Sequence, residues 1–314
     1  MLFLILHIVL ISGFGLILKY AQNRGHRLKQ IGFMNYLWAF LISVWSAVRA
    51  GGFAFTKLTF ACGFTNGVTY STGFLLVTLG MRLSGVVVTI AVARLSLVVP
   101  IVFAIWFWKE IPNIWQAVGI ILTCCALPLL GTKTDTARQK GQEKEPLGEK
   151  VGTSQTSTFL PSQVPSVLGV GAGQGLGFLV VAILFVNSGI SRLAMKAFNE
   201  MCPIDQKPMY LLFLFSTTAI AYAGISLYQK IVPSRWEVFY GLLIGICNVG
   251  GSWTFLKALD RIDALIAFPV SGSGGVLFTT LVGVLLLGER LDRRSMIGVV
   301  ATILALIFVN LKGE

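Results

Sequence analysis

Long apolar stretches alternate with short charged connectors along most of the 314 residues. Ten stretches could each form a membrane-spanning helix, because a hydrocarbon core of about 30 Å needs roughly 20 helical residues. The pattern therefore predicts an all-α membrane protein with ten transmembrane helices. The predicted spans are residues 2–20, 31–48, 58–80, 85–107, 114–131, 167–191, 209–228, 236–257, 264–287 and 295–311.

One connector differs from the others in length and composition. Residues 132–166 are polar, of mixed charge and rich in Gly, Ser, Thr and Pro, which is typical of a flexible linker. This linker divides the chain into a first five-helix unit, residues 1–131, and a second, residues 167–314. We expect it to tether the two units without taking part in their function.

Features at the ends of the predicted spans recur at a constant spacing of 179 positions. The related pairs are Arg82 and Arg261, Glu110 and Glu289, Asn113 and Asp292, Gly119 and Gly298, Thr123 and Thr302, and Ala126 and Ala305. Asn and Asp are favoured helix N-caps, and Asn113 and Asp292 stand just before the fifth and tenth spans. Because each unit has an odd number of spans, the second must enter the membrane in the opposite orientation. Such an inverted repeat is typical of transporters, with the site near the midplane.

Composition supports a membrane protein and argues against a nucleic-acid-binding one. Charged residues make up 12% of the chain, whereas a soluble domain carries about 25%. The formal net charge is +12, but the basic residues are scattered among the connectors. This scatter is typical of loops that face lipid headgroups, and it forms no continuous phosphate-binding stripe.

Arg94 is the one basic residue deep inside a predicted span, and no Asp or Glu lies at such a depth. It is the tenth residue of its span, about 13 Å from the helix start. Ionisable residues at this depth are by default candidates for a functional site. One interpretation is that Arg94 faces a water-filled cavity and attracts an anionic or carboxylate-bearing substrate. The other is that it is a structural strut that binds backbone carbonyls.

A second polar segment lies in the ninth span, where residues 268–275 read Phe-Pro-Val-Ser-Gly-Ser-Gly-Gly. Pro269 removes a helix hydrogen bond, and Ser271 and Ser273 bring hydroxyl groups to the same stretch. The spacing of 179 relates Ser273 to Arg94, so both helices become polar at one depth. The segment is either an irregular lining of a cavity or a run of small residues for close helix packing.

Two further helix faces carry polar residues at membrane depth. Asn66, Thr69 and Tyr70 share one face of the third span, and Asn248 and Ser252 share one face of the eighth. A cavity wall and an interhelical hydrogen bond explain each face equally well. The spacing of Gly241 and Gly245 indicates helix packing. We predict a substrate site formed by Arg94, Asn66, Tyr70, Asn248, Ser252, Ser271 and Ser273.

The sequence carries no signature of an enzyme, a cofactor or a metal site. The two histidines, His7 and His26, cannot form a histidine-cluster metal site. The five cysteines have no metal-type spacing, and no phosphate-binding Gly-x-x-x-x-Gly-Lys-Ser/Thr loop is present.

The segment Gly-Glu-Arg-Leu at 288–291, followed by Gly298, is echoed by Lys-Glu-Ile-Pro at 109–112, followed by Gly119. In these motifs the chain resembles the EamA-type ten-helix members of the drug/metabolite transporter superfamily, over all but the linker. The resemblance implies an inverted-repeat carrier that works by alternating access around a central cavity, with cytoplasmic termini. The four-helix relatives export cations with a Glu in their first helix. The first and sixth spans here have no acid, so that mechanism is not carried over.

The predicted function is a secondary carrier or exporter of a small polar metabolite, anionic or zwitterionic, such as an amino acid. A helical membrane receptor or sensor is the alternative. The expected partners are a small-molecule substrate and membrane lipid, and no nucleic acid. We expect a multi-pass protein of the plasma or inner membrane that uses no intramembrane carboxylate as a proton relay.

Overall fold

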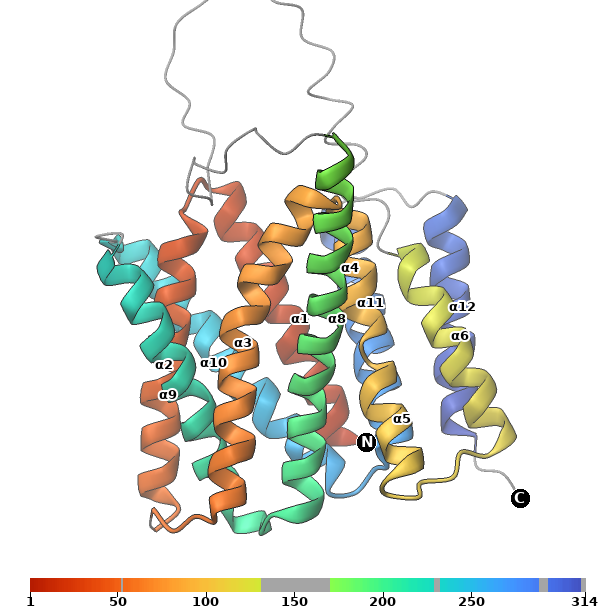
Figure 1. The fold of residues 1–314 in the computed structure, drawn as a ribbon, viewed down its shortest axis with the longest axis horizontal. Helices are drawn as coiled ribbons and strands as arrows, with labels where there is room; N and C mark the ends of the chain where they lie inside the picture. Colours follow the sequence, from red (N-terminus) through yellow and green to blue (C-terminus); the bar gives the residue numbers. More distant parts are fainter. Residues whose placement is uncertain (52, 131–169, 229–231, 288–292, 312–314) are drawn as a thin grey trace, which may run out of the picture.

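The computed structural model describes residues 1–51, 53–130, 170–228, 232–287 and 293–311 (Figure 1). All regular elements in these ranges are helical, and the predicted linker 132–166 lies outside them. The elements are α1 (Leu2–Asn23), α2 (Leu28–Arg49), α3 (Lys57–Leu83), α4 (Val86–Leu95), α5 (Val98–Trp106), α6 (Ile114–Leu130), α8 (Val170–Met201), the 3₁₀ helix η1 (Ile204–Gln206), α9 (Lys207–Tyr228), α10 (Arg235–Leu259), α11 (Ala264–Leu287) and α12 (Arg293–Asn310).

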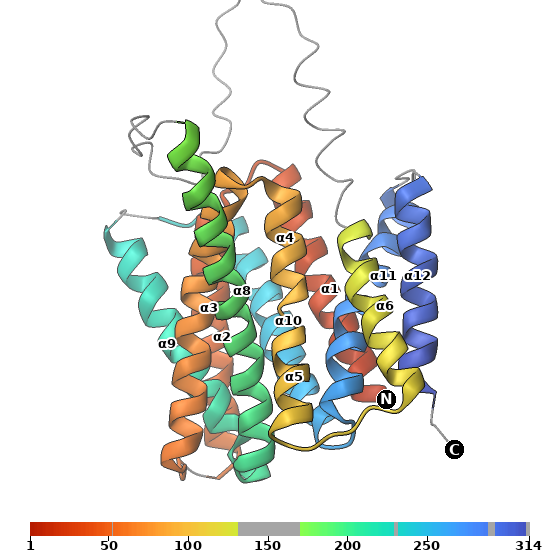
Figure 2. The ribbon, with the colours of Figure 1, turned by 45° about the vertical axis from the view of Figure 1, so that its right-hand side comes forward.

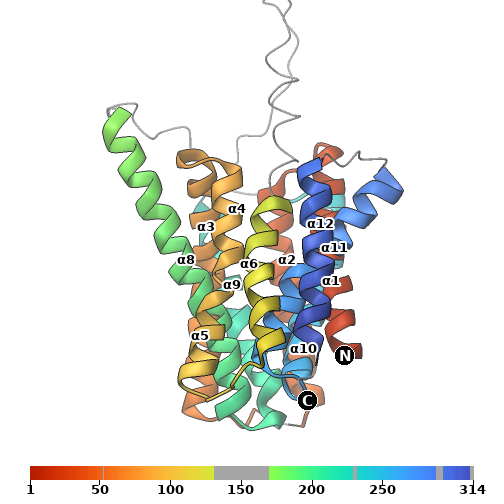
Figure 3. The same cartoon turned by 90° about the vertical axis from the view of Figure 1, so that its right-hand side faces the viewer.

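The helices stand side by side as one bundle, and successive transmembrane segments run in alternating directions (Figures 1 and 3). Seven helical segments of the described ranges are long and apolar enough to cross a membrane. The chain is therefore an integral, multi-pass membrane protein. We call the end of the bundle where α1 begins and α12 ends the terminal end. At the opposite end α6 finishes and α8 begins (Figure 2).

Several helix starts are fixed by side-chain caps. Asn113 Oδ1 accepts the backbone N–H of Gln116 at 2.7 Å at the start of α6, which confirms the predicted N-cap. The Gln116 side chain accepts the N–H of Asn113 in return, at 3.0 Å. Ser234 and Glu237 form the same reciprocal capping box at the start of α10. Each cap satisfies backbone donors that a helix start leaves without an intrahelical partner.

Glycine pairs bring helices of the two halves into close contact. A Cβ on Gly241 of α10 would lie 2.3 Å from Met34 Cβ on α2, and one on Gly245 would lie 3.0 Å from Trp38 Cβ. The packing predicted for the Gly241 and Gly245 spacing is therefore confirmed. On α3, a Cβ on Gly63 would lie 2.8 Å from the Tyr210 carbonyl oxygen of α9. Small residues allow helix backbones to approach closely, which drives association in a membrane.

The sequence misplaced the end of one helix. The sixth span was expected to end at residue 191, but α8 continues to Met201. Arg192 and Lys196 therefore lie within a helix of the bundle, and Lys196 is 1% exposed. The expectation that Arg94 is the one basic residue deep in a span was wrong, because the apolar face of α8 continues past its charges.

A helix is interrupted in the fourth predicted span, whereas the ninth span is a continuous helix. Residues 85–107 form two helices, α4 and α5, joined by a turn at Ser96 and Leu97. Pro100 has no N–H to donate to the Ser96 carbonyl, and that carbonyl accepts the N–H of Val99 at 3.1 Å instead. In contrast α11 is continuous through Pro269 and the serines that follow. Of the two interpretations of residues 268–275, the irregular segment is therefore wrong, although Ser271 and Gly272 do line the cavity described below.

Close packing explains part of the small-residue run in α11. A Cβ on Gly274 would lie 2.5 Å from Ile8 Cδ1 of α1. Pro269 is the sixth residue of α11, so its missing N–H affects the first turns of the helix. A proline this close to a helix start interrupts few hydrogen bonds, and the helix continues.

Candidate substrate-binding cavity

A cavity of about 180 Å³ lies between the two halves of the chain. Its walls come from α1, α3, α4, α8, α10 and α11, together with the turn between α4 and α5. The lining residues are His7, Ile11, Tyr70, Arg94, Leu97, Ser191, Arg192, Met195, Ser252, Phe255, Phe268, Ser271 and Gly272. Two guanidinium groups, one imidazole and several hydroxyl groups thus share a small space, and no carboxylate stands among these residues.

The turn between α4 and α5 is held by Arg192 of α8. Its Nη1 donates to the Ala93 carbonyl at 3.3 Å and to the Ser96 hydroxyl. The Ser96 hydroxyl also donates to the Ala93 carbonyl, at 2.7 Å. The N–H of Leu97, which a continuous helix would give to Ala93, goes to the Arg94 carbonyl instead. Arg192 therefore stabilises a freed carbonyl at the C-terminus of α4, where the helix dipole favours a cation.

Arg94 is in the last turn of α4 and lines the same cavity. Its Nη1 atom is buried and has no hydrogen-bond partner among the described residues. A buried donor without a partner is destabilising by about 1–3 kcal/mol, and by more when it is charged. The role of a structural strut that binds a backbone carbonyl, which was one interpretation of Arg94, thus belongs to Arg192. The guanidinium of Arg94 is available for a ligand.

His7 joins α1 to α10 and α11 at the cavity wall. Its Nδ1 lies 2.8 Å from the Gly251 carbonyl oxygen, and its Nε2 lies 2.7 Å from Ser271 Oγ. Its ring also packs against Phe255, with ring centroids 4.7 Å apart. His7 is 8% exposed. The imidazole therefore has a fixed position and a polar edge on the cavity.

The seven residues predicted for the site fall into two groups. Arg94, Tyr70, Ser252 and Ser271 come from four different helices and line the cavity together. The other three, Asn66, Asn248 and Ser273, are outside the lining and bond to neighbouring helices.

The bonds of those three residues show why they are outside the wall. Asn66 donates to Tyr210 Oη at 2.6 Å and accepts the Ser191 hydroxyl at 2.6 Å. Asn248 donates to Asn35 Oδ1 at 3.4 Å. Ser273 donates to Thr123 Oγ1 at 3.4 Å. For these residues the interhelical hydrogen bond is the interpretation that the geometry supports, although Asn66 orients the cavity residue Ser191.

Three of the polar cavity residues were absent from the sequence prediction, namely His7, Ser191 and Arg192. Ser191 and Arg192 fell at the predicted end of the sixth span. A signal for a longer helix was present, because apolar residues continue at helical spacing through Leu193, Ala197 and Phe198. His7 was considered only as a metal ligand, and its position inside the first predicted span was not used to predict a cavity residue.

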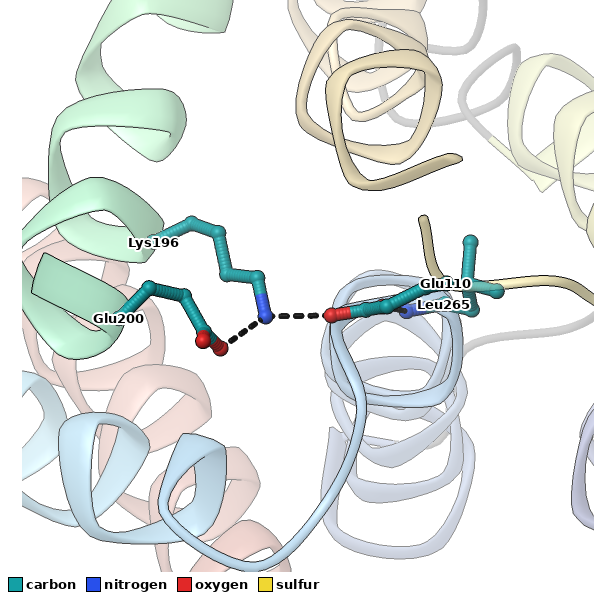
Figure 4. A network of polar contacts seen from close by, with 4 residues as sticks. All are labelled: Glu110, Lys196, Glu200 and Leu265. Carbon is teal, nitrogen blue, oxygen red and sulfur yellow. Dashed lines mark hydrogen bonds and ion pairs between the residues drawn. The ribbon is translucent and has the colours of Figure 1, made fainter. Parts of the chain in front are cut away.

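A buried network of polar contacts connects Glu110, Lys196, Glu200 and Leu265 (Figure 4). Lys196 Nζ of α8 is 2.5 Å from Glu110 Oε1 and 2.5 Å from Glu200 Oε1. Glu110 stands in the connector between α5 and α6, and its Oε2 accepts the N–H of Leu265 at 3.3 Å. The Glu110 carboxylate thus meets the first turn of α11. The network thus joins the first half of the chain to two helices of the second.

A second hollow, of about 430 Å³, lies at the terminal end. Its charged residues include Asp205, Lys207, Lys257, Asp260 and Arg261. Lys207 and Asp260 form an ion pair, and Lys257 Nζ lies 5.5 Å from the centroid of the Trp253 ring. Its cations therefore have partners, and the central cavity is the stronger candidate for a binding site.

Comparison with known proteins identifies the second half of the chain. Residues 173–311, which include most of α8 and all of α9 to α12, match the model of the EamA-like transporter family. This part of the chain is therefore similar in sequence to the EamA-like transporter family. The predicted resemblance to the drug/metabolite transporter superfamily is confirmed over these residues. The EamA-like segment supplies the cavity residues of α8, α10 and α11.

The whole chain shares its fold with a solved protein. The match to this structure, described as "Crystal structure of protein", has a TM-score of 0.71 and covers 99% of this chain and 97% of the other. The two sequences are 13% identical over the match, so the likeness concerns the fold. No curated protein matches the chain in sequence. The EamA-like segment and the first half together therefore make up one known architecture.

Proposed function

We propose that the protein is a secondary transporter of a small anionic or carboxylate-bearing solute and works by alternating access. The observation that carries the proposal is the buried, unpartnered Nη1 of Arg94 at the cavity wall. A carboxylate satisfies two guanidinium donors at once through a bidentate pair. Because Arg192 adds a second positive charge, the cavity favours anions over cations.

The size of the cavity limits the solute. Pockets for drug-sized ligands measure roughly 300–1,000 Å³. The central cavity of about 180 Å³ is smaller, which favours a metabolite of a few heavy atoms. The hydroxyl groups of Tyr70, Ser191, Ser252 and Ser271 supply acceptors for an ammonium group, so a small amino acid also fits the chemistry.

We further propose that the chain forms ten transmembrane helices in two inverted five-helix repeats. Helix packing supports this, because exchanging the halves maps the most extensive helix contacts onto one another. Under the exchange α1 corresponds to α8, α2 to α9, α3 to α10, α4 and α5 to α11, and α6 to α12. The contact of α3 with α8 then corresponds to that of α10 with α1, and α3 with α9 to α10 with α2. In addition α2 packs on α9 and α6 on α12, which are counterparts.

Two other observations support the inversion. α1 begins at the terminal end and α8 begins at the opposite end, so the halves run in opposite directions (Figure 1). The glycine pair Gly63 and Gly67 of α3 packs on α9, and the pair Gly241 and Gly245 of α10 packs on α2. These are corresponding interfaces under the exchange. A cavity between inverted repeats is where transporters bind their substrates.

Contacts between the halves join them at the terminal end. The Lys196 and Glu110 pair joins α8 to the connector after α5. Gln206 Oε1, next to α9, accepts the backbone N–H of Thr56 at 3.0 Å and the Thr59 hydroxyl at 2.6 Å. In the proposed cycle these contacts break when the cavity opens toward the terminal end.

A receptor or sensor is the second candidate, because a cavity that binds a solute can also signal. The test is counterflow in proteoliposomes with labelled lactate, pyruvate, aspartate, glutamate and glycine, and with choline and putrescine as cations. We expect exchange of at least one acid and no exchange of the cations. Binding of an acid without exchange would support the receptor, and exchange of the cations alone would refute the anion preference.

A further inference from the structure

His7 has two hydrogen bonds that fix its tautomer. A backbone carbonyl can accept but not donate, so the Nδ1 atom facing Gly251 carries a proton. In the neutral ring Nε2 then has a lone pair, and it accepts the hydroxyl proton of Ser271 at 2.7 Å. A second proton on the ring can therefore bind only at Nε2. This edge of the ring belongs to the cavity wall.

We propose that His7 is a proton-binding site that couples proton movement to binding of the anion, an inference that rests on the proposed function. A proton from solution binds Nε2, and Nε2–H then donates to Ser271 Oγ. The Ser271 hydroxyl hydrogen, displaced from that bond, turns toward the cavity and donates to the carboxylate. No covalent bond other than N–H forms, and the same proton leaves when the cavity faces the other side.

The charges around His7 make the two binding events depend on each other. Arg94 of α4, Arg192 of α8 and Tyr70 of α3 face the same cavity, while α10 contributes Ser252 and Phe255 and α11 contributes Ser271. Among the residues that the structure describes, no carboxylate lines this cavity. A third positive charge beside two guanidinium groups is unfavourable until an anion compensates it. Coupling is reciprocal, so the anion binds more tightly to the protonated protein by the same factor.

The arrangement predicts symport of one proton with each solute. It differs from the carboxylate relay of the four-helix relatives, because the proton acceptor is an imidazole. The negative charge of a bound anion favours the protonated, positively charged form of such a ring. A transmembrane difference of one pH unit then drives about tenfold accumulation of the solute, since one proton carries about 1.4 kcal/mol per unit.

The chain contains a matched control for this experiment. It has two histidines, and His26 follows α1 outside the cavity. Proteoliposomes with an acid exterior are assayed with the five labelled acids for uptake, and separately for counterflow without a gradient. For the wild type and His26→Gln we expect about tenfold accumulation per pH unit. For His7→Gln we expect counterflow at a lower rate, with no accumulation above equilibration.

The outcomes separate the two proposals. Absence of counterflow of every acid in the wild type would refute the proposed function. Counterflow together with full accumulation by His7→Gln would refute the proton site alone. If His7→Gln does not fold, ¹⁵N NMR of the wild type in nanodiscs replaces it. At fixed pH, added acetate should increase the doubly protonated fraction of His7 but not of His26, and an unchanged His7 signal would overturn the inference.

Discussion

Replacing Lys196 with Met should destabilise the protein more than any exposed lysine does. The substitution keeps most of the apolar stem and removes the charge that binds Glu110 and Glu200. Breaking a buried ion pair costs about 3–5 kcal/mol when the remaining charge stays buried. The Glu110 side chain is 15% exposed and keeps the N–H of Leu265, so we expect the lower end, about 3 kcal/mol. That is roughly a hundredfold change in the unfolding equilibrium.

The assay is reversible unfolding in mixed micelles of increasing SDS fraction. Lys57→Met is the matched control, because Lys57 is an exposed residue at the start of α3, and it should change stability by less than about 0.5 kcal/mol. Adding Glu110→Gln to Lys196→Met should recover at least about 1 kcal/mol, because the unpaired carboxylate is then gone. A loss below about 0.5 kcal/mol for Lys196→Met, or strict additivity in the double variant, would contradict the network described here.

Three further predictions follow from the packing, the broken helix and the linker. Gly241→Ala should destabilise by about 1–3 kcal/mol because its Cβ meets Met34, whereas Gly224→Ala, with open space, should be neutral or stabilising. Equal effects in SDS unfolding would refute this. Arg192→Lys should lower both stability and counterflow, because one ammonium cannot reproduce the guanidinium contacts at the turn. Wild-type values would refute the role. Replacing 132–166 by a Gly/Ser linker should preserve counterflow at equal membrane abundance, and its loss would show that the segment has another role.

The spans were predictable because membrane helices are encoded by uninterrupted apolar runs. The structure places every described helix within or close to a predicted span. The differences, namely the break after α4 and the continuity of α11, have physical causes. The break after α4 depends on Pro100 removing a bond four residues earlier, whereas Pro269 stands near a helix start and interrupts little. Sequence alone shows both prolines but not which carbonyl finds a substitute donor.

The candidate site was predictable only in part, because depth in the membrane does not give direction around a helix. Asn66 and Tyr70 share one face of α3, yet Tyr70 meets the cavity and Asn66 meets Tyr210. Arg192 was missed because its charge is accommodated by partners on α4, which the sequence does not reveal. Whether Arg94 or Arg192 holds the broken helix depends on a side-chain contact between two halves of the chain. That contact depends on how the helices pack against each other, which the sequence does not reveal.

Glu289 lies outside the described residues, and from the sequence we predict a part for it in folding. By its position in the repeat it corresponds to Glu110, which forms the ion pair with Lys196. Glu289→Gln should mainly lower the yield of folded protein. Loss of pH-driven transport in correctly folded Glu289→Gln protein would instead assign it a part in coupling.

The most direct test of the account is substrate binding by Arg94 variants. Binding of the best exchanged acid is measured by scintillation proximity on purified wild type, Arg94→Lys, Arg94→Gln and Arg49→Gln, whose exposed arginine lies at the end of α2. We predict that Arg94→Gln weakens binding by about 10–150-fold, the equivalent of roughly 1.5–3 kcal/mol for a charged hydrogen bond. Arg94→Lys should fall between, and Arg49→Gln should match the wild type. Wild-type affinity in folded Arg94→Gln protein would contradict the central claim that this guanidinium binds the substrate.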